Sequence, residues 1–134
     1  MIRLKPQTRK LIAEREDDLV EHAHKIAQAL KQDKVRQIRN ILEVAESTSS
    51  WKALELFIRY QAARGELPKK WAEMTIQELE ALQQEATKIQ QKAQKKVKAP
   101  EELDSVKAIH LELVTRVLGH TVRWHIWDVK RREG

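Results

Sequence analysis

The chain has 134 residues, with 26 Lys and Arg against 20 Asp and Glu for a formal net charge of +6, and it contains no cysteine. This length fits one domain and is too short for two comfortable ones. The missing cysteines exclude disulfides, thiolate catalysis and thiolate metal sites, and the basic charge favours an anionic partner. Few glycines and prolines interrupt a composition rich in Ala, Leu, Gln, Glu, Lys and Arg, so we expect an all-α fold.

Neither a membrane span nor a secretory signal is expected. No window approaches the ~18 consecutive apolar residues that a membrane-spanning helix needs. The first ten residues lack the apolar block of a signal peptide. Together with the absence of cysteine, these features predict a cytoplasmic protein.

The first third of the chain predicts two helices. After a short basic arm over residues 1–6, apolar residues recur at helical spacing through residues 7–31, which predicts one continuous first helix. Asp33 has a side chain suited to cap a second helix. The polar run at residues 47–50 is typical of a turn and should end that helix.

The remaining chain predicts three more helices. The third begins near Trp51 and ends at Gly65 and Pro68. Thr75 and Glu78 have the spacing of a capping box, so we expect the fourth helix to start there. Its apolar residues step by three or four and form a narrow seam suited to an antiparallel neighbour.

A break at residues 98–100 separates the fourth helix from a fifth, which extends to about residue 132. Pro100 fits the first turn of this last helix, because its missing N–H would be unpaired there anyway. Five helices with apolar stripes and short loops predict a compact antiparallel bundle that forms a single domain over residues 1–134.

The tryptophans and histidines have expected places in this bundle. Trp51 and Trp124 are in phase with apolar neighbours and are predicted to lie in the core, whereas Trp71 falls in the loop before the fourth helix. His22 and His24 are two residues apart and project differently from a helix, so they cannot form a paired metal site. The other histidines, His110, His120 and His125, are predicted at the surface or its boundary.

No catalytic constellation is visible in the sequence. There is no glycine-rich phosphate loop, no nucleophile elbow and no dinucleotide fingerprint. The carboxylates fall where acidic residues favour helix starts or solvated faces. We therefore expect neither an enzyme nor a bound cofactor or metal.

One face of the last predicted helix combines cations with an aromatic ring. Along it lie Arg116, His120, Arg123, Trp127 and Lys130, at spacings of four, three, four and three residues. We call this face the basic strip. Bases can stack on the ring while the cations hold phosphates, so the strip suits a single-stranded nucleic acid.

A second interpretation of the basic strip stays open. It is an ordinary solvated face if Glu112 pairs with Arg116 and Trp127 packs against a neighbouring segment. The two interpretations differ in a testable way. If the strip binds RNA, we expect charge reversal at Arg116 and Arg123 to weaken RNA retention without changing the fold.

Further basic residues lie on the second and third predicted helices. They would merge with the basic strip into one groove if the second, third and fifth helices pack together. The alternative is that Arg39 pairs with Glu43 and Arg59 with Glu55, each pair contributing only ~0.5 kcal/mol on an exposed helix.

Three short segments carry a resemblance to a known family. They are KVRQIRNIL at residues 34–42, a leucine-rich stretch at 54–65 with YQAAR at its centre, and VRWHIW at 122–127. In this order they resemble three helices of the small subunit of type III CRISPR effector complexes. The resemblance spans roughly residues 33–134.

The resemblance implies a non-catalytic antiviral-defence subunit, with cleavage and nucleotide signalling carried out by other subunits. It would pack on the backbone and large subunits and on further copies of itself, and line the channel that holds guide RNA paired to target RNA. Contacts to the RNA backbone would not read sequence and would weaken with added salt. The residues expected on this RNA-binding face are Arg36, Arg39, Arg59, Arg64, Arg116, Arg123, Trp127 and Lys130.

Two other classes of function remain as alternatives. A DNA-binding regulator of helix-turn-helix type could use the turn at 47–50, but its recognition helix would begin with Trp51 and become mainly apolar, which is poor for reading base edges. A structural adaptor would instead pair the fourth-helix seam at residues 79–97 with another protein and use its charges for solubility.

Overall fold

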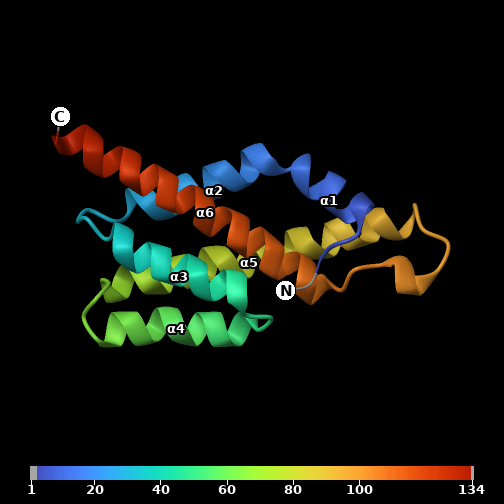
Figure 1. The fold of residues 1–134 in the computed structure, drawn as a ribbon, viewed down its shortest axis with the longest axis horizontal. Helices are drawn as coiled ribbons and strands as arrows, with labels where there is room; N and C mark the ends of the chain where they lie inside the picture. Colours follow the sequence, from blue (N-terminus) through green and yellow to red (C-terminus); the bar gives the residue numbers. More distant parts are fainter. Residues whose placement is uncertain (1–2, 134) are drawn as a thin grey trace.

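The computed structural model describes residues 3–133, and all regular secondary structure within them is helical (Figure 1). The expected all-α fold is confirmed, with six α-helices in this range instead of five. Residues 1–2 of the predicted basic arm, and residue 134, lie outside the described part of the chain. The elements are α1 (Pro6–Ala13), α2 (Glu16–Gln28), α3 (Val35–Ser47), α4 (Trp51–Ala63), α5 (Lys69–Gln94), the 3-10 turn η1 (Pro100–Glu102) and α6 (Val106–Glu133).

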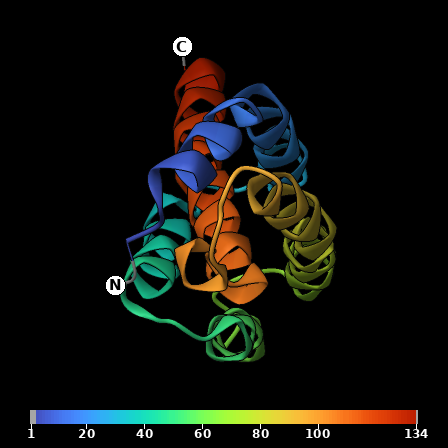
Figure 2. The ribbon, with the colours of Figure 1, turned by 90° about the vertical axis from the view of Figure 1, so that its right-hand side faces the viewer.

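The last helix, α6, is the centre of the fold. It packs against α2, α3 and α5, while α4 packs mainly on α3 and α5, and α1 packs on α5 (Figure 2). Leu113, Val117 and Leu118 of α6 are completely buried. Burying a side chain of this size stabilises the fold by about 1.5–3 kcal/mol. Packing on several sides therefore makes α6 the main source of the core.

The helices α2 and α6 run in the same direction. Glu16 lies beside Arg116, and further along both helices, one turn later in α2 and about two turns later in α6, the Trp124 indole N–H donates to the Val20 carbonyl at 3.1 Å. Both helices advance together, so this pair is parallel. An antiparallel arrangement of all helices, as expected from the short loops, is therefore wrong for this pair.

The helices α5 and α6 run in opposite directions. His110 near the start of α6 bonds to the Leu79 carbonyl at 2.9 Å, whereas Gln90, further along α5, donates to the carbonyl of Asp104 before α6 at 3.0 Å. The predicted seam of α5 is buried, at Leu79, Leu82, Ala86, Ile89 and Ala93. The expectation of an antiparallel neighbour for this seam is confirmed.

The first predicted helix is broken at residues 14–15, giving α1 and α2. The Arg15 N–H donates to the Ile12 carbonyl at 2.9 Å, which tightens the last turn of α1. Glu16, Asp17 and Asp18 then fill the first turn of α2. Carboxylates favour a helix N-terminus, so this acidic run marks a new helix start inside the predicted one.

The fourth predicted helix starts earlier than its capping-box pattern indicates. It begins at Lys69, directly after Pro68, so Thr75 lies well inside α5, where it is completely buried. Trp71, expected in a loop, lies in the first turn of α5 and is 3% exposed. Its indole N–H donates to the Ile26 carbonyl at 2.9 Å. Burial of the Trp71 ring against α2 favours a helix that begins before the capping-box pattern at Thr75 and Glu78.

The start of the last helix also differs from the prediction. Pro100 lies in the 3-10 turn η1, and α6 begins at Val106. The Ser105 hydroxyl accepts a hydrogen bond from the Ala108 N–H at 3.1 Å, as an N-cap residue does. Proline suits the first turn of either kind of helix, so the serine cap decides where α6 starts.

Other local signals are confirmed. The Ser50 hydroxyl accepts from the Ala53 N–H at 3.0 Å and caps α4, and Gly65 ends that helix with φ of 80°. Asp33 accepts from the Val35 N–H at 3.2 Å at the start of α3, although the N-cap position itself is occupied by Lys34, which makes no side-chain cap. The described part of the predicted basic arm is held in place, because Leu4 is buried in the core.

Candidate nucleic-acid interface

The first half of the basic strip is bound to carboxylates of the protein itself. Arg116 Nη1 lies 2.7 Å from Glu16 Oε1, and His120 Nε2 donates to Glu16 Oε2 at 2.6 Å. The Arg116 Nε also donates to Glu112 at 2.8 Å, which confirms that predicted pair. Arg116 is thus held between two carboxylates, and it ties α6 to α2.

The charges of this cluster reinforce each other. Partial burial raises the pKa of Glu16, but the hydrogen bonds from His120 and Arg116 outweigh it and hold that pKa below its ordinary value. Burial disfavours the charged form of Arg116 and so lowers its pKa. The hydrogen bonds and charges of Glu112 and Glu16 outweigh this effect and raise the pKa of Arg116 above its ordinary value. Arg116 therefore stays charged, and its charge is compensated inside the fold.

The second half of the strip is open to solvent. Arg123, Trp127 and Lys130 are exposed. The Trp127 side chain is 59% exposed, so the close packing that the alternative interpretation assigns to it is not formed. Lys130 lies 3.6 Å from Glu133, but both side chains are well solvated, and such a pair contributes little. These three residues are available to a ligand.

Arg123 is held by a histidine and not by a carboxylate. Its Nη1 lies 3.2 Å from His120 Nδ1, while the other ring nitrogen of His120 bonds to Glu16. A guanidinium is only a donor, so Nδ1 accepts and Nε2 carries the proton. No ion pair of Arg123 occurs within residues 3–133, and its side chain is exposed.

A shallow pocket of about 290 Å³ lies beside Trp127, between α2 and α6. We call it the tryptophan pocket. The half-buried Trp124 forms part of its wall, with its ring stacked on His24 at a centroid distance of 4.0 Å. Trp124 was expected in the core, but it is only partly buried: it packs against the core and also lines this pocket. The lining residues are Val20, His120, Arg123, Trp124 and Trp127.

The predicted basic residues of α3 lie at the surface. Arg36 and Arg39 are exposed, and in the described part of the chain neither forms an ion pair, so the expected pair of Arg39 with Glu43 is absent. The helix α3 packs against α6. Both arginines therefore remain candidates for contact with phosphates.

The predicted basic residues of α4 are not brought to the basic strip. Arg59 pairs with Glu55, as predicted, and also with Glu73 at 3.1 Å; its hydrogen bond to Glu55 is the main cause of its raised pKa. The Arg64 guanidinium lies 5.5 Å from the centre of the Tyr60 ring. Arg116 and His120 of the strip bond to Glu16 of α2. The helix α4 lies at the edge of the molecule away from α2 (Figure 2). A single groove including α4 is therefore not formed.

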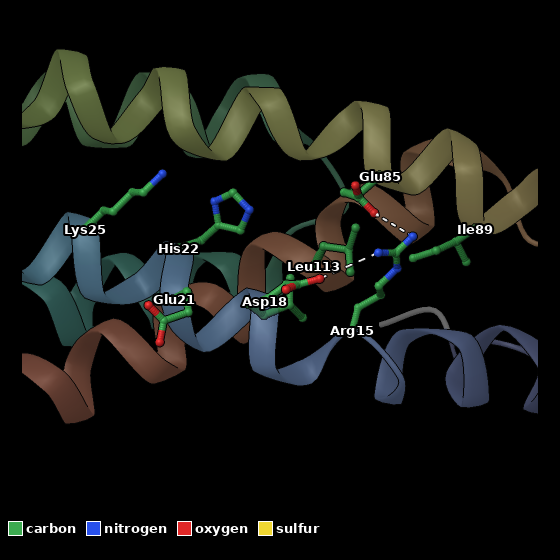
Figure 3. Close-up of a pocket in the computed structure, with 9 residues that line it drawn as sticks. Arg15, Asp18, Glu21, His22, Lys25, Glu85, Ile89 and Leu113 are labelled. Atoms are coloured by element: carbon green, nitrogen blue, oxygen red, sulfur yellow. Dashed lines mark ion pairs between the residues drawn. The ribbon is translucent and has the colours of Figure 1, made fainter.

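A second pocket, of about 170 Å³, separates α2 from α5 (Figure 3). Arg15 reaches across it to Glu85 at 3.5 Å and also lies 3.6 Å from Asp18. Near the other end, His22 lies 3.3 Å from Glu78. Charges of both signs line this pocket, and the pairs of Arg15 with Glu85 and of His22 with Glu78 join α2 to α5. The lining carboxylates Asp18, Glu21 and Glu85 outnumber the lining cations Arg15 and Lys25 by one, so the pocket does not favour an anionic ligand.

Two histidines predicted at the surface are buried in the core. His110 is 2% exposed, donates to the Leu79 carbonyl and meets the edge of Trp51; His125 is completely buried and accepts the Lys34 N–H at 2.9 Å. Burial lowers the pKa of both imidazoles. Their helix positions share a phase with buried leucines and valines, which is the signal that could have placed them.

Within residues 3–133, no group of three or more His, Asp or Glu side chains is placed so that it could hold a metal ion. Within the same range, no helix combines the length and the apolarity that crossing a membrane requires. Comparison with known proteins finds no matching family, curated protein or solved structure. The function is therefore inferred from the site itself.

Proposed function

We propose that this chain is a non-catalytic RNA-binding subunit that contacts the RNA backbone through the open half of the basic strip, which consists of Arg123, Trp127 and Lys130. The observation that carries the proposal is the exposed ring of Trp127 between Arg123 and Lys130. Cations that no carboxylate holds tightly can bind phosphates, and an aromatic ring beside them favours nucleic acid over other anions.

The resemblance of three short segments to the small subunit of type III CRISPR effector complexes is what supports this choice of assembly in the proposal. In it, the chain packs on backbone and large subunits and on its own copies in the cytoplasm, and lines the channel of guide and target RNA. Arg36 and Arg39 of α3 would add phosphate contacts. Arg116 instead joins α6 to α2 through Glu16, and Arg59 is bound at the surface by Glu55 and Glu73.

The outer face of α4 fits a protein contact in the same proposal. Leu56 is 67% exposed and Tyr60 is 53% exposed, and both lie on the side of α4 away from the core. Large apolar side chains left in solvent are typical of protein interaction sites. A structural adaptor would use this face alone, without any contact to nucleic acid.

The experiment that tests the proposed function is purification of the tagged protein from its native host, with mass spectrometry of proteins and sequencing of RNA. We expect a multi-subunit ribonucleoprotein that carries short guide RNAs derived from repeats. Recovery of duplex DNA would favour the regulator, and recovery of an unrelated protein without RNA would favour the adaptor. Either result would overturn the proposal.

A matched pair of variants separates the RNA contact from assembly. Arg123→Gln with Lys130→Gln removes two charges from the open half of the strip, and Lys52→Gln with Arg59→Gln removes two charges from α4. We expect only the first pair to lower RNA recovery and to reduce the salt dependence of RNA binding. Equal recovery with both pairs would contradict the assignment of this surface.

A further inference from the structure

Trp127 differs from the other tryptophans of the chain. Trp71 donates to the Ile26 carbonyl, Trp124 donates to the Val20 carbonyl, and Trp51 packs on the buried His110. Within residues 3–133, the Trp127 indole has no hydrogen-bond partner, and its ring is 59% exposed. The fold therefore does not use this ring, although an exposed tryptophan leaves much apolar surface in water.

The hollow beside this ring has a rigid wall. The Trp124 ring is fixed by stacking on His24, with ring planes 14° apart, and by its hydrogen bond to the Val20 carbonyl. The parallel packing of α2 on α6 positions Trp124, His24 and Val20 relative to one another. A flat, mainly apolar hollow that is already in place loses little conformational freedom when a flat ligand enters.

Cations lie on both sides of the ring along α6. Arg123 is four residues before Trp127 and Lys130 three residues after it, so all three share one helix face. Arg123 also lines the pocket. A base on the ring would bring its neighbouring phosphates toward these two side chains. An apolar side chain of a protein would use the hollow but would leave both cations without a partner.

We infer that the tryptophan pocket holds one unpaired nucleobase, with Arg123 and Lys130 binding the adjacent phosphates, so that this site takes single-stranded RNA in preference to duplex RNA. A duplex buries the faces of its bases in its own stack, and only an unpaired base can place its face on a protein ring. This inference depends on the proposed function and deepens it, because it assigns the site to an unpaired nucleotide of the guide or target RNA and not to the segment in which the two are paired.

The test compares three labelled ligands at low salt: a short oligouridylate, an abasic ribose-phosphate oligomer of the same length, and an RNA duplex. Binding is followed by fluorescence anisotropy and by quenching of tryptophan emission. We expect the oligouridylate to bind about tenfold more tightly than the abasic oligomer. In Trp127→Ala this difference should disappear, while Leu56→Ala, which also removes an exposed apolar side chain, should keep it.

The outcomes separate this inference from the proposed function. Equal, salt-dependent binding of the base-bearing and abasic oligomers would overturn the base pocket and leave backbone binding intact. Binding of neither oligomer would overturn both. If polyglutamate quenches the tryptophan emission and Trp127→Ala abolishes this, the pocket belongs to an acidic protein partner and the inference is wrong. Unchanged circular dichroism of Trp127→Ala would show that the fold persists.

Discussion

At the scale of single residues, Glu16 decides which cations of α6 are available to a ligand. Its carboxylate takes up Arg116 and orients His120, which in turn contacts Arg123. Five residues that share a face in sequence therefore act as two groups. One group joins helices and the other is open to solvent.

Reversing the charge of Arg116 is therefore expected to lower the stability of the fold, in contrast to the sequence-based expectation that it changes only RNA retention. Arg116→Glu would place a third carboxylate beside Glu16 and Glu112 and remove their shared hydrogen-bond donor. We expect the free energy of unfolding to fall by about 2 kcal/mol. Urea denaturation measures this, with Arg123→Glu as a control that should change it little. Equal stability of the two variants would contradict the structural role of Arg116.

Gly119 offers a residue-scale prediction of opposite sign. It lies inside α6, where glycine is less favourable than alanine by about 1 kcal/mol. A Cβ atom added there would meet only Arg123 Nη1, at 3.7 Å, which is an ordinary contact. We expect Gly119→Ala to raise the free energy of unfolding by about 0.5–1 kcal/mol in urea denaturation. A loss of stability would mean that the helix requires a glycine here.

At the scale of elements, His125 joins α6 to the connection between α2 and α3. Its Nε2 accepts the N–H of Lys34, the residue before α3. Burial lowers the pKa of His125, Asp33 and Asp128 oppose this, and Arg132 adds to it. Only an unprotonated nitrogen can accept a hydrogen bond, so the fold requires the neutral imidazole.

This requirement predicts a pH dependence of stability. In the unfolded chain His125 takes up a proton near pH 6.5, while in the folded protein it resists protonation, so stability is present above about pH 6.5 and is lost as pH falls. The buried His110 contributes with the same sign. We expect His125→Gln to be less stable at neutral pH by about 1 kcal/mol and to lose less stability on acidification. Urea denaturation at a series of pH values measures both; parallel curves would contradict the prediction.

At the scale of the whole molecule, the central position of α6 means that truncating its buried side chains costs more stability than truncating the exposed side chains of α4. Leu118 of α6 is completely buried, whereas Leu56 of α4 is 67% exposed. We expect Leu118→Ala to lower the free energy of unfolding by about 2–5 kcal/mol. Leu56→Ala should change it by no more than about 0.5 kcal/mol. Urea denaturation compares the two, and a large effect of Leu56→Ala would mean that α4 uses its outer face within the fold.

The sequence by itself determined where most helices lie and which face of each is apolar. Helical periodicity and short-range caps such as Ser50 and Gly65 act within a few residues, so the bounds of α3 and α4 were predictable. The same periodicity placed Arg123, Trp127 and Lys130 on one face. These are properties of a single helix, and local spacing contains them.

Only the tertiary structure decided the early start of α5 and the parallel pairing of α2 with α6. Each depends on contacts between distant residues, such as Trp71 with the Ile26 carbonyl. The division of the basic strip has the same origin, because Glu16 lies about a hundred residues before its partners in the chain. Helical spacing identifies side chains that share a face, but packing determines which carboxylates meet them.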